Sequence, residues 1–119
     1  MPDYLKEILT QSGFRNYVVN SKEVPENGLV FCYPSWSSSY MILKSFLKHL
    51  EERDPGSPLY IYDIDTAAYQ LFAQRYNFIS HGRGELVYLR DGSIVAAIER
   101  YKGNVDDEIS MFLKAVTQQ

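Results

Sequence analysis

Few side chains in this chain have the types and spacing that chemistry requires. Cys32 is the only cysteine, which excludes an internal disulfide, and it lies in an apolar run where a free cysteine behaves as a small hydrophobe. His49 and His81 have no cysteine or carboxylate at the spacing of metal ligands, so we expect no metal and no cofactor. Asp63 and Asp65 fall on one side of a strand end. Asp65 is interpreted as a helix cap, because catalytic carboxylates would also need a cleft.

Alternating strands and helices must position these residues. Apolar runs predict strands at residues 17–19, 29–33, 59–64, 86–89 and 94–98. Apolar residues three and four positions apart predict four helices, the first ending at Gly13. Their apolar residues are Leu5, Ile8 and Leu9; Leu43, Phe46, Leu47 and Leu50; Ala68, Leu71 and Phe72; and Val105, Ile109, Phe112, Leu113 and Val116.

The order of these elements defines the fold class. Strands that alternate with helices imply parallel pairing, and Asp91-Gly92 predicts the tight turn of an antiparallel hairpin. The expected architecture is an α/β fold, a three-layer α/β/α sandwich with a mixed central sheet, formed by a single domain over residues 1–119. The sequence leaves open which face of the sheet the first helix covers.

The composition narrows the classes of function. The net charge is −3 and the pI about 5.3, and Lys and Arg form no cluster, which argues against nucleic-acid binding. No apolar run approaches the roughly 18 residues that a membrane span needs. The N-terminus lacks the basic and apolar segments of a signal peptide. With a single cysteine, these features favour a reducing, cytoplasmic setting.

Three stretches of the sequence are similar to parts of one known family. VFCYPSW at residues 30–36 resembles the strand and loop that precede the redox motif of thioredoxins, including the tryptophan. YIYDID at residues 60–65 resembles their central strand. LVYLRDG at residues 86–92, followed by YKG at 101–103, resembles their closing hairpin and the glycine before the last helix. The order and spacing of these pieces resemble the thioredoxin family over most of the chain, which implies a thioredoxin-like form of the sandwich.

The chain departs from the thioredoxin pattern at the positions that carry its chemistry. Ser37 stands where the nucleophilic cysteine would be, and Tyr40 where the resolving cysteine would be. Phe31 replaces a buried aspartate, Gly84 the cis-proline and Glu85 a threonine. A serine hydroxyl cannot replace a thiolate in disulfide exchange, since its pKa is far too high and it forms no S–S bond. A cis peptide at Gly84 is not expected, because a cis bond without proline costs about 2.5–4 kcal/mol.

Ser37 has three interpretations. The first is that Ser37 or a neighbouring serine caps the following helix by accepting backbone N–H bonds. The second is a catalytic serine with His81 as its base, since the resemblance brings the loop at residues 82–84 close to this helix end. No Gly-x-Ser-x-Gly elbow or orienting carboxylate supports it. The third is an anion held at the helix N-terminus with help from Arg83.

The leading hypothesis for function is a redox-inactive, thioredoxin-like module that binds another protein. The resemblance implies a groove beside Trp36 and the Gly84 loop that accepts an extended peptide. An exposed tryptophan with tyrosines nearby has the composition of an interface hot spot, although Trp36 and Tyr40 could also simply pack on the loop and helix. The predicted binding residues are Trp36, Ser37, Tyr40, Tyr33, Arg83 and Gly84.

Such a module could be an assembly or chaperone-like factor, a subunit of a complex, or an inhibitor. The acidic charge would suit a basic partner, such as a toxin bound by an immunity protein. An alternative is an enzyme other than a dithiol oxidoreductase, for example a transferase that activates a bound thiol with the hydroxyl of Ser37 or Tyr40. The family's transferases normally use a second domain, however. A further alternative is a homodimer whose interface buries the aromatic residues.

Overall fold

A computed structural model describes residues 4–35 and 39–117. Two residues predicted to bind, Trp36 and Ser37, lie outside the described residues. Helices and strands follow one another in the predicted order along the chain. They are α1 (Tyr4–Gln11), β1 (Tyr17–Val19), β2 (Gly28–Tyr33), α2 (Tyr40–Glu52), β3 (Leu59–Asp63), α3 (Ala67–Tyr76), β4 (Leu86–Arg90), β5 (Ser93–Ile98) and α4 (Val105–Thr117).

The five strands form one mixed sheet in the order β1-β3-β2-β4-β5. β3 is parallel to both β1 and β2, whereas β4 is antiparallel to β2 and β5 is antiparallel to β4. Asp91 and Gly92 close the β4–β5 hairpin with φ of 51° and 78°. Positive φ at both central residues is the geometry of the tight turn that Asp-Gly favours, so the predicted hairpin is confirmed.

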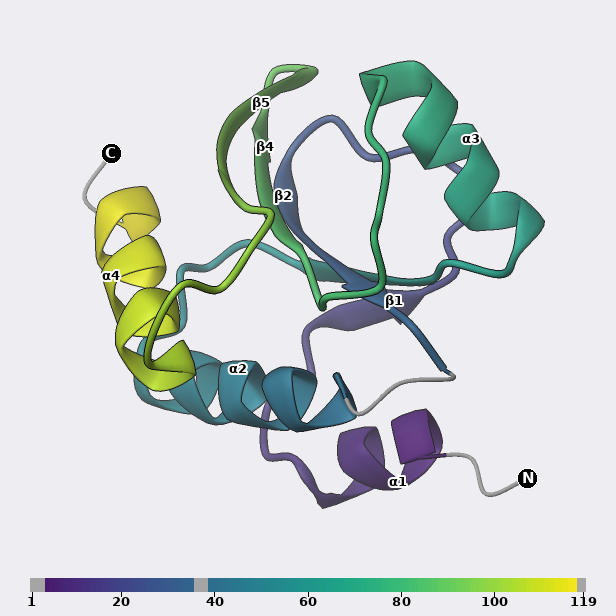
Figure 1. The fold of residues 1–119 in the computed structure, drawn as a ribbon. Helices are drawn as coiled ribbons and strands as arrows, with labels where there is room; N and C mark the ends of the chain where they lie inside the picture. The colour runs from purple at the N-terminus through teal and green to yellow at the C-terminus, as the bar shows by residue number, and fades with distance from the viewer. Residues whose placement is uncertain (1–3, 36–38, 118–119) are drawn as a thin grey trace.

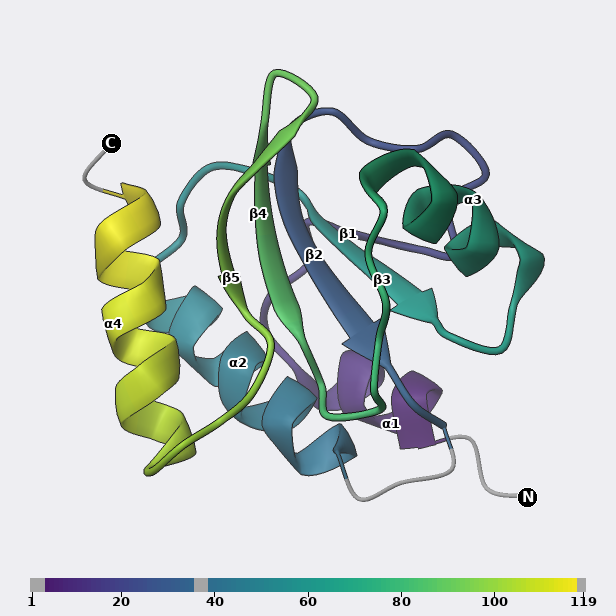
Figure 2. The ribbon, with the colours of Figure 1, turned by 45° about the horizontal axis from the view of Figure 1, so that its top comes forward.

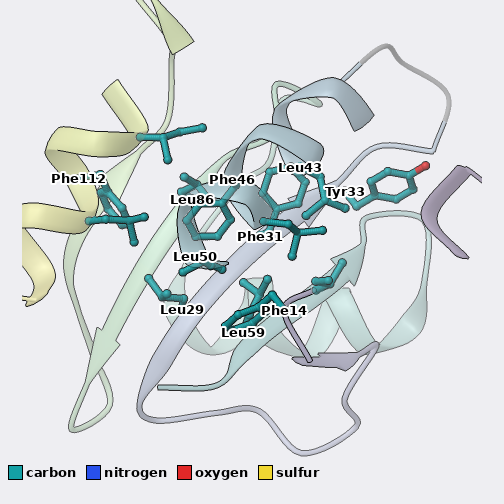
Figure 3. Packing of buried hydrophobic residues seen from close by; sticks show 14 of the residues in the cluster. Phe14, Leu29, Phe31, Tyr33, Leu43, Phe46, Leu50, Leu59, Leu86 and Phe112 are labelled. Atoms are coloured by element: carbon teal, nitrogen blue, oxygen red, sulfur yellow. The ribbon is translucent and has the colours of Figure 1, made fainter. Parts of the chain in front are cut away.

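Helices cover both faces of the sheet, as predicted for a three-layer sandwich. Figure 1 shows α3 on one side of the sheet and α1, α2 and α4 on the other. Each side has its own hydrophobic cluster, one around Phe31, Phe46 and Phe112 and the other around Tyr62 and Phe72. Figure 3 shows part of the first cluster, where side chains of α2 and α4 pack on β2. The sequence left open which face of the sheet α1 covers. In the structure α1 lies against α2 and covers the same face as α2 and α4.

The helical periodicity predicted α2 correctly and α3 only in part. Leu43, Phe46, Leu47 and Leu50 of α2 are all buried. In α3 the prediction for Leu71 is wrong, because Leu71 is 47% exposed and Ala68, Tyr69 and Phe72 face the sheet. The large aromatic rings of Tyr69 and Phe72 take the inner face, which leaves the leucine on the solvent side.

The end of α1 and the cap of α3 differ from the predictions, and four strands have one end shifted by one residue. α1 ends at Gln11, two residues before the predicted stop at Gly13. The cap of α3 is Thr66, whose hydroxyl accepts from the Tyr69 N–H at 3.3 Å, so the assignment of Asp65 as the cap is wrong. Asp63 accepts from the Asp65 N–H at 3.0 Å and shapes the turn that leads into this cap. Of the helices described, none combines the length and the hydrophobicity that crossing a membrane requires.

Candidate functional site

The first turn of α2 meets the loop at residues 80–84, as the family resemblance implied. Ser39 Oγ donates to the carbonyl oxygen of Gly82 at 3.1 Å. Gly84 is buried with φ of +74°, and a Cβ there would lie 3.2 Å from Phe31 and 3.3 Å from Ile42. Glycine is therefore favoured at this contact by its positive φ, and the space around it is tight. The structure brings Gly84 and the start of α2 together. Figure 2 shows this loop next to the N-terminal end of α2.

Glu85, which the sequence did not mark as a site residue, holds this loop from inside. Its side chain is buried with only 1% exposed. Oε1 accepts from Ser80 Oγ at 2.7 Å, and Oε2 accepts from the His81 N–H at 2.6 Å. The Glu85 carbonyl oxygen also accepts from the Cys32 N–H at 3.0 Å. The one signal in the sequence for this role was a carboxylate directly before the apolar run of β4. Charged residues are rarely buried without partners, so a carboxylate at the start of a buried strand indicates hydrogen-bond donors close to it.

Tyr101 fixes the loop from the side of α4. Its hydroxyl donates to the Gly84 carbonyl oxygen at 2.8 Å. Burial raises the pKa of the Tyr101 phenol well above its usual range, and the negative charges of Glu108 and Glu85 raise it further. The phenol therefore stays protonated and remains a donor. Three separate parts of the chain, represented by Ser39, Glu85 and Tyr101, thus hold the loop in one conformation.

Cys32 lies beneath this loop and is fully buried. Burial raises the pKa of the Cys32 thiol far above its usual value, and the negative charge of Glu85 adds to the effect. The thiolate is the nucleophilic form of cysteine, so burial and charge both suppress reactivity here. The side chain acts as a small apolar group in the cluster around Tyr62 and Phe72.

The tyrosines predicted to bind differ in position. Tyr33 is 4% exposed and belongs to the core, where Figure 3 shows it with Phe31 and Leu43. It can support a binding surface from beneath but offers little area to a partner. Tyr40, at the start of α2, stacks on Tyr4 of α1 with ring centroids 5.0 Å apart and planes at 9°. One face of the Tyr40 ring is therefore already occupied within the chain.

Other parts of the predicted site are open to solvent. Arg83 and His81 are exposed on the loop. Met41, on the first turn of α2, is 56% exposed, although the sequence analysis did not select it. Ser39 stands at the N-cap position of α2 without making a side-chain cap, so the predicted capping role does not fall to this serine. Ser37, and with it the proposed Ser37–His81 pair, lies outside the described residues.

A serine, a histidine and an aspartate come together elsewhere, between α2 and α4. Ser45 Oγ donates to Asp106 Oδ1, and His49 Nε2 lies 3.1 Å from the same oxygen. These two hydrogen bonds lower the pKa of the Asp106 carboxyl. Because the aspartate stands between the serine and the histidine, the histidine cannot take the serine proton, and the set lacks the nucleophile–base contact of a catalytic triad. It joins two helices.

No protein-family model matches the chain, and no curated protein matches it. Among solved structures, thioredoxin O2 from Arabidopsis thaliana in its oxidised state aligns with a TM-score of 0.60 over 87% of this chain and 92% of that one. The fold is thioredoxin-like. Sequence identity in that alignment is 16%, so the comparison supports the fold and nothing finer.

Within this thioredoxin-like fold, the chain has one cysteine and therefore no Cys-x-x-Cys motif. In the residues that the structure describes, no group of three or more His, Cys, Asp and Glu side chains could hold a metal ion. What the site offers is a surface, formed by the first turn of α2 and a loop held by internal hydrogen bonds.

Proposed function

We propose that this protein is a redox-inactive, thioredoxin-like module that binds another protein through the first turn of α2 and the loop at residues 80–84. The observation that carries the proposal is the fixed geometry of this loop. Ser39, Glu85 and Tyr101 each hold it by a hydrogen bond, while Arg83 in the loop and Met41 in the first turn of α2 are exposed. A surface that is already ordered loses little conformational entropy when a partner binds.

The chemistry of the surface favours a protein partner over a small reactive substrate. Met41 supplies a flexible apolar side chain that adapts to a partner, and Arg83 supplies donors for carboxylate or carbonyl oxygens. The single thiol, Cys32, is buried below the surface and is held protonated. A net charge of −3 also favours association with a basic protein.

The test compares two exposed methionines as variants of the full chain. Met41→Ala changes the proposed surface, and Met111→Ala removes an equally flexible side chain, 69% exposed, from α4. Each variant and the wild type serve as bait for proteins of the native host. We expect a partner to be captured by the wild type and by Met111→Ala and to be lost with Met41→Ala. Equal capture by both variants would place the binding surface elsewhere.

A further inference from the structure

The first turn of α4 carries three acidic side chains, Asp106, Asp107 and Glu108. Negative charge at a helix N-terminus is favourable because of the helix dipole, and this effect does not require the carboxylates to make particular contacts. Two of the three nevertheless form hydrogen bonds outside the helix. Asp106 bonds to α2, and Glu108 bonds to the segment between β5 and α4. The Asp107 side chain has no hydrogen-bond partner among the described residues.

Glu108 fixes the backbone directly before α4. Its Oε2 accepts from the N–H groups of Lys102 and Gly103, each at 3.1 Å. The helix already has a cap of its own, because Asn104 Oδ1 accepts from the Asp107 N–H at 3.0 Å. The bonds of Glu108 are therefore additional to the cap. A carboxylate that accepts from two consecutive N–H groups holds that part of the chain in one conformation.

Tyr101 connects this segment to the loop at residues 80–84. It is the residue next to Lys102, and its hydroxyl donates to the Gly84 carbonyl oxygen at 2.8 Å. Its ring packs against the larger hydrophobic cluster. The position of the hydroxyl depends on the backbone from which the ring projects, and Glu108 fixes that backbone. A short path of contacts thus leads from the first turn of α4 to the loop.

The same turn of α4 is also bound to α2. Asp106 Oδ1 accepts from Ser45 Oγ, and His49 Nε2 lies 3.1 Å from it. Ser45 lies one helical turn beyond Met41, and Figure 1 shows α4 beside α2. One turn of α4 therefore contacts α2 directly and the loop at residues 80–84 through the segment before α4. The two parts of the proposed binding surface share this support.

We propose that Glu108 is a positioning residue for the binding surface, which acts through Tyr101 to hold the loop at residues 80–84 in place relative to the first turn of α2. This inference rests on the proposed function, because it makes binding depend on a side chain that lies outside the surface. A loop that is not held samples several conformations. A partner that recognises one of them then binds more weakly.

The first test is hydrogen exchange of the full chain, which needs no partner. The probe is the N–H of His81 in the loop, and the reference is the N–H of Leu59 in β3, which donates to a backbone carbonyl beside β1 at 2.9 Å. In Glu108→Gln we expect the His81 N–H to exchange about tenfold faster, while the Leu59 rate stays unchanged. Asp107→Asn removes the same charge from the same turn and should change neither rate.

A double variant shows whether Glu108 acts through Tyr101. Tyr101→Phe removes the hydroxyl and keeps the ring, so it should also accelerate exchange at His81. Adding Glu108→Gln to Tyr101→Phe should produce no further acceleration, because the hydroxyl that Glu108 positions is already absent. A full further acceleration in the double variant would overturn the proposal, and so would an unchanged His81 rate in Glu108→Gln.

The second test uses Glu108→Gln and Asp107→Asn as baits for proteins of the native host, beside the wild type. Glu108→Gln should capture less of the partner, and Asp107→Asn should capture as much as the wild type. Undiminished capture by Glu108→Gln would overturn the inference and leave the proposed function standing. Absence of any partner on the wild-type bait would count against the proposed function, and the exchange rates would still decide whether Glu108 positions the loop.

Discussion

Ser80 Oγ donates a hydrogen bond of 2.7 Å to Glu85 Oε1, and the Glu85 side chain that accepts it is only 1% exposed. The second carboxylate oxygen accepts from the His81 N–H. The buried carboxylate thus accepts hydrogen bonds from the loop, as backbone carbonyl oxygens do between strands. It satisfies donors that would otherwise be buried without a partner.

Replacing Glu85 with glutamine tests this role. The amide has one acceptor oxygen and presents N–H groups to a site that needs two acceptors. We expect Glu85→Gln to lower the free energy of unfolding by about 2 kcal/mol, the range for hydrogen bonds to a charged group. Urea denaturation measures the change, and Glu99→Gln, at an exposed position after β5, is the control. A loss no larger than that of the control would contradict the role of Glu85.

Gly84 and Gly56 allow backbone strain to be separated from packing. Their φ angles are +74° and +78°, but a Cβ at Gly84 would meet Phe31 and Ile42, whereas a Cβ at Gly56 would have no atom within 4 Å. Alanine at Gly56 should cost about 1 kcal/mol for the left-handed backbone alone. Alanine at Gly84 should cost this amount plus about 1–3 kcal/mol for overpacking. Equal losses in thermal or urea unfolding would show that Gly84 is needed only for its φ angle.

The reactivity of Cys32 tests the absence of thiol chemistry. Because the thiol is fully buried and its pKa is raised, a thiol reagent such as Ellman's reagent should modify the native protein far more slowly than the protein in urea. The protein should also fail to accelerate the reduction of insulin by dithiothreitol. Rapid modification of the native thiol, or any catalysis of insulin reduction, would contradict the proposed redox inactivity.

Periodicity and turn chemistry predicted much of this fold. Leu43 and Leu50 were assigned to the core of α2 because helical spacing directly reports which face is apolar. The hairpin followed from Asp91 and Gly92, since few residues accept positive φ. Leu71 was misplaced because the third helix is apolar on more than one side. Periodicity alone cannot decide which apolar side chain faces the sheet.

The candidate site was harder to predict than the fold. The contact of Tyr4 with Tyr40 and the hydrogen bond of Ser39 to Gly82 join residues far apart in the sequence, and no local pattern encodes them. Glu85 was visible only as a charge at the start of a buried strand, and its partners depend on how the loop folds back. The sequence could locate the loop and the helix, but it could not show which groups hold them together.

Two tyrosine hydroxyls on the α3 side of the sheet, those of Tyr62 and Tyr69, differ in their hydrogen bonding. Tyr62 Oη is buried and has no hydrogen-bond partner among the residues that the structure describes, whereas Tyr69 Oη accepts from the Ser80 N–H at 2.8 Å. We expect Tyr62→Phe to raise the free energy of unfolding by about 1 kcal/mol and Tyr69→Phe to lower it by about 1 kcal/mol. Urea denaturation of both variants checks the signs. A similar loss in both would indicate that Tyr62 Oη is hydrogen-bonded in solution.

The pH dependence of stability should report the contact between Asp106 and its two partners. Hydrogen bonds from Ser45 and His49 lower the pKa of Asp106 in the folded protein. A carboxyl whose folded pKa lies below its unfolded value of about 3.9 stabilises the fold above that value, and the contribution is lost as the pH falls through the folded pKa. Asp106→Asn should therefore reduce the melting temperature at neutral pH and have a smaller effect near pH 3. Asp107→Asn, in the same first turn of α4 but without these partners, is the control. An Asp106→Asn effect that stays constant between the two pH values would show that the two hydrogen bonds do not favour the charged carboxylate.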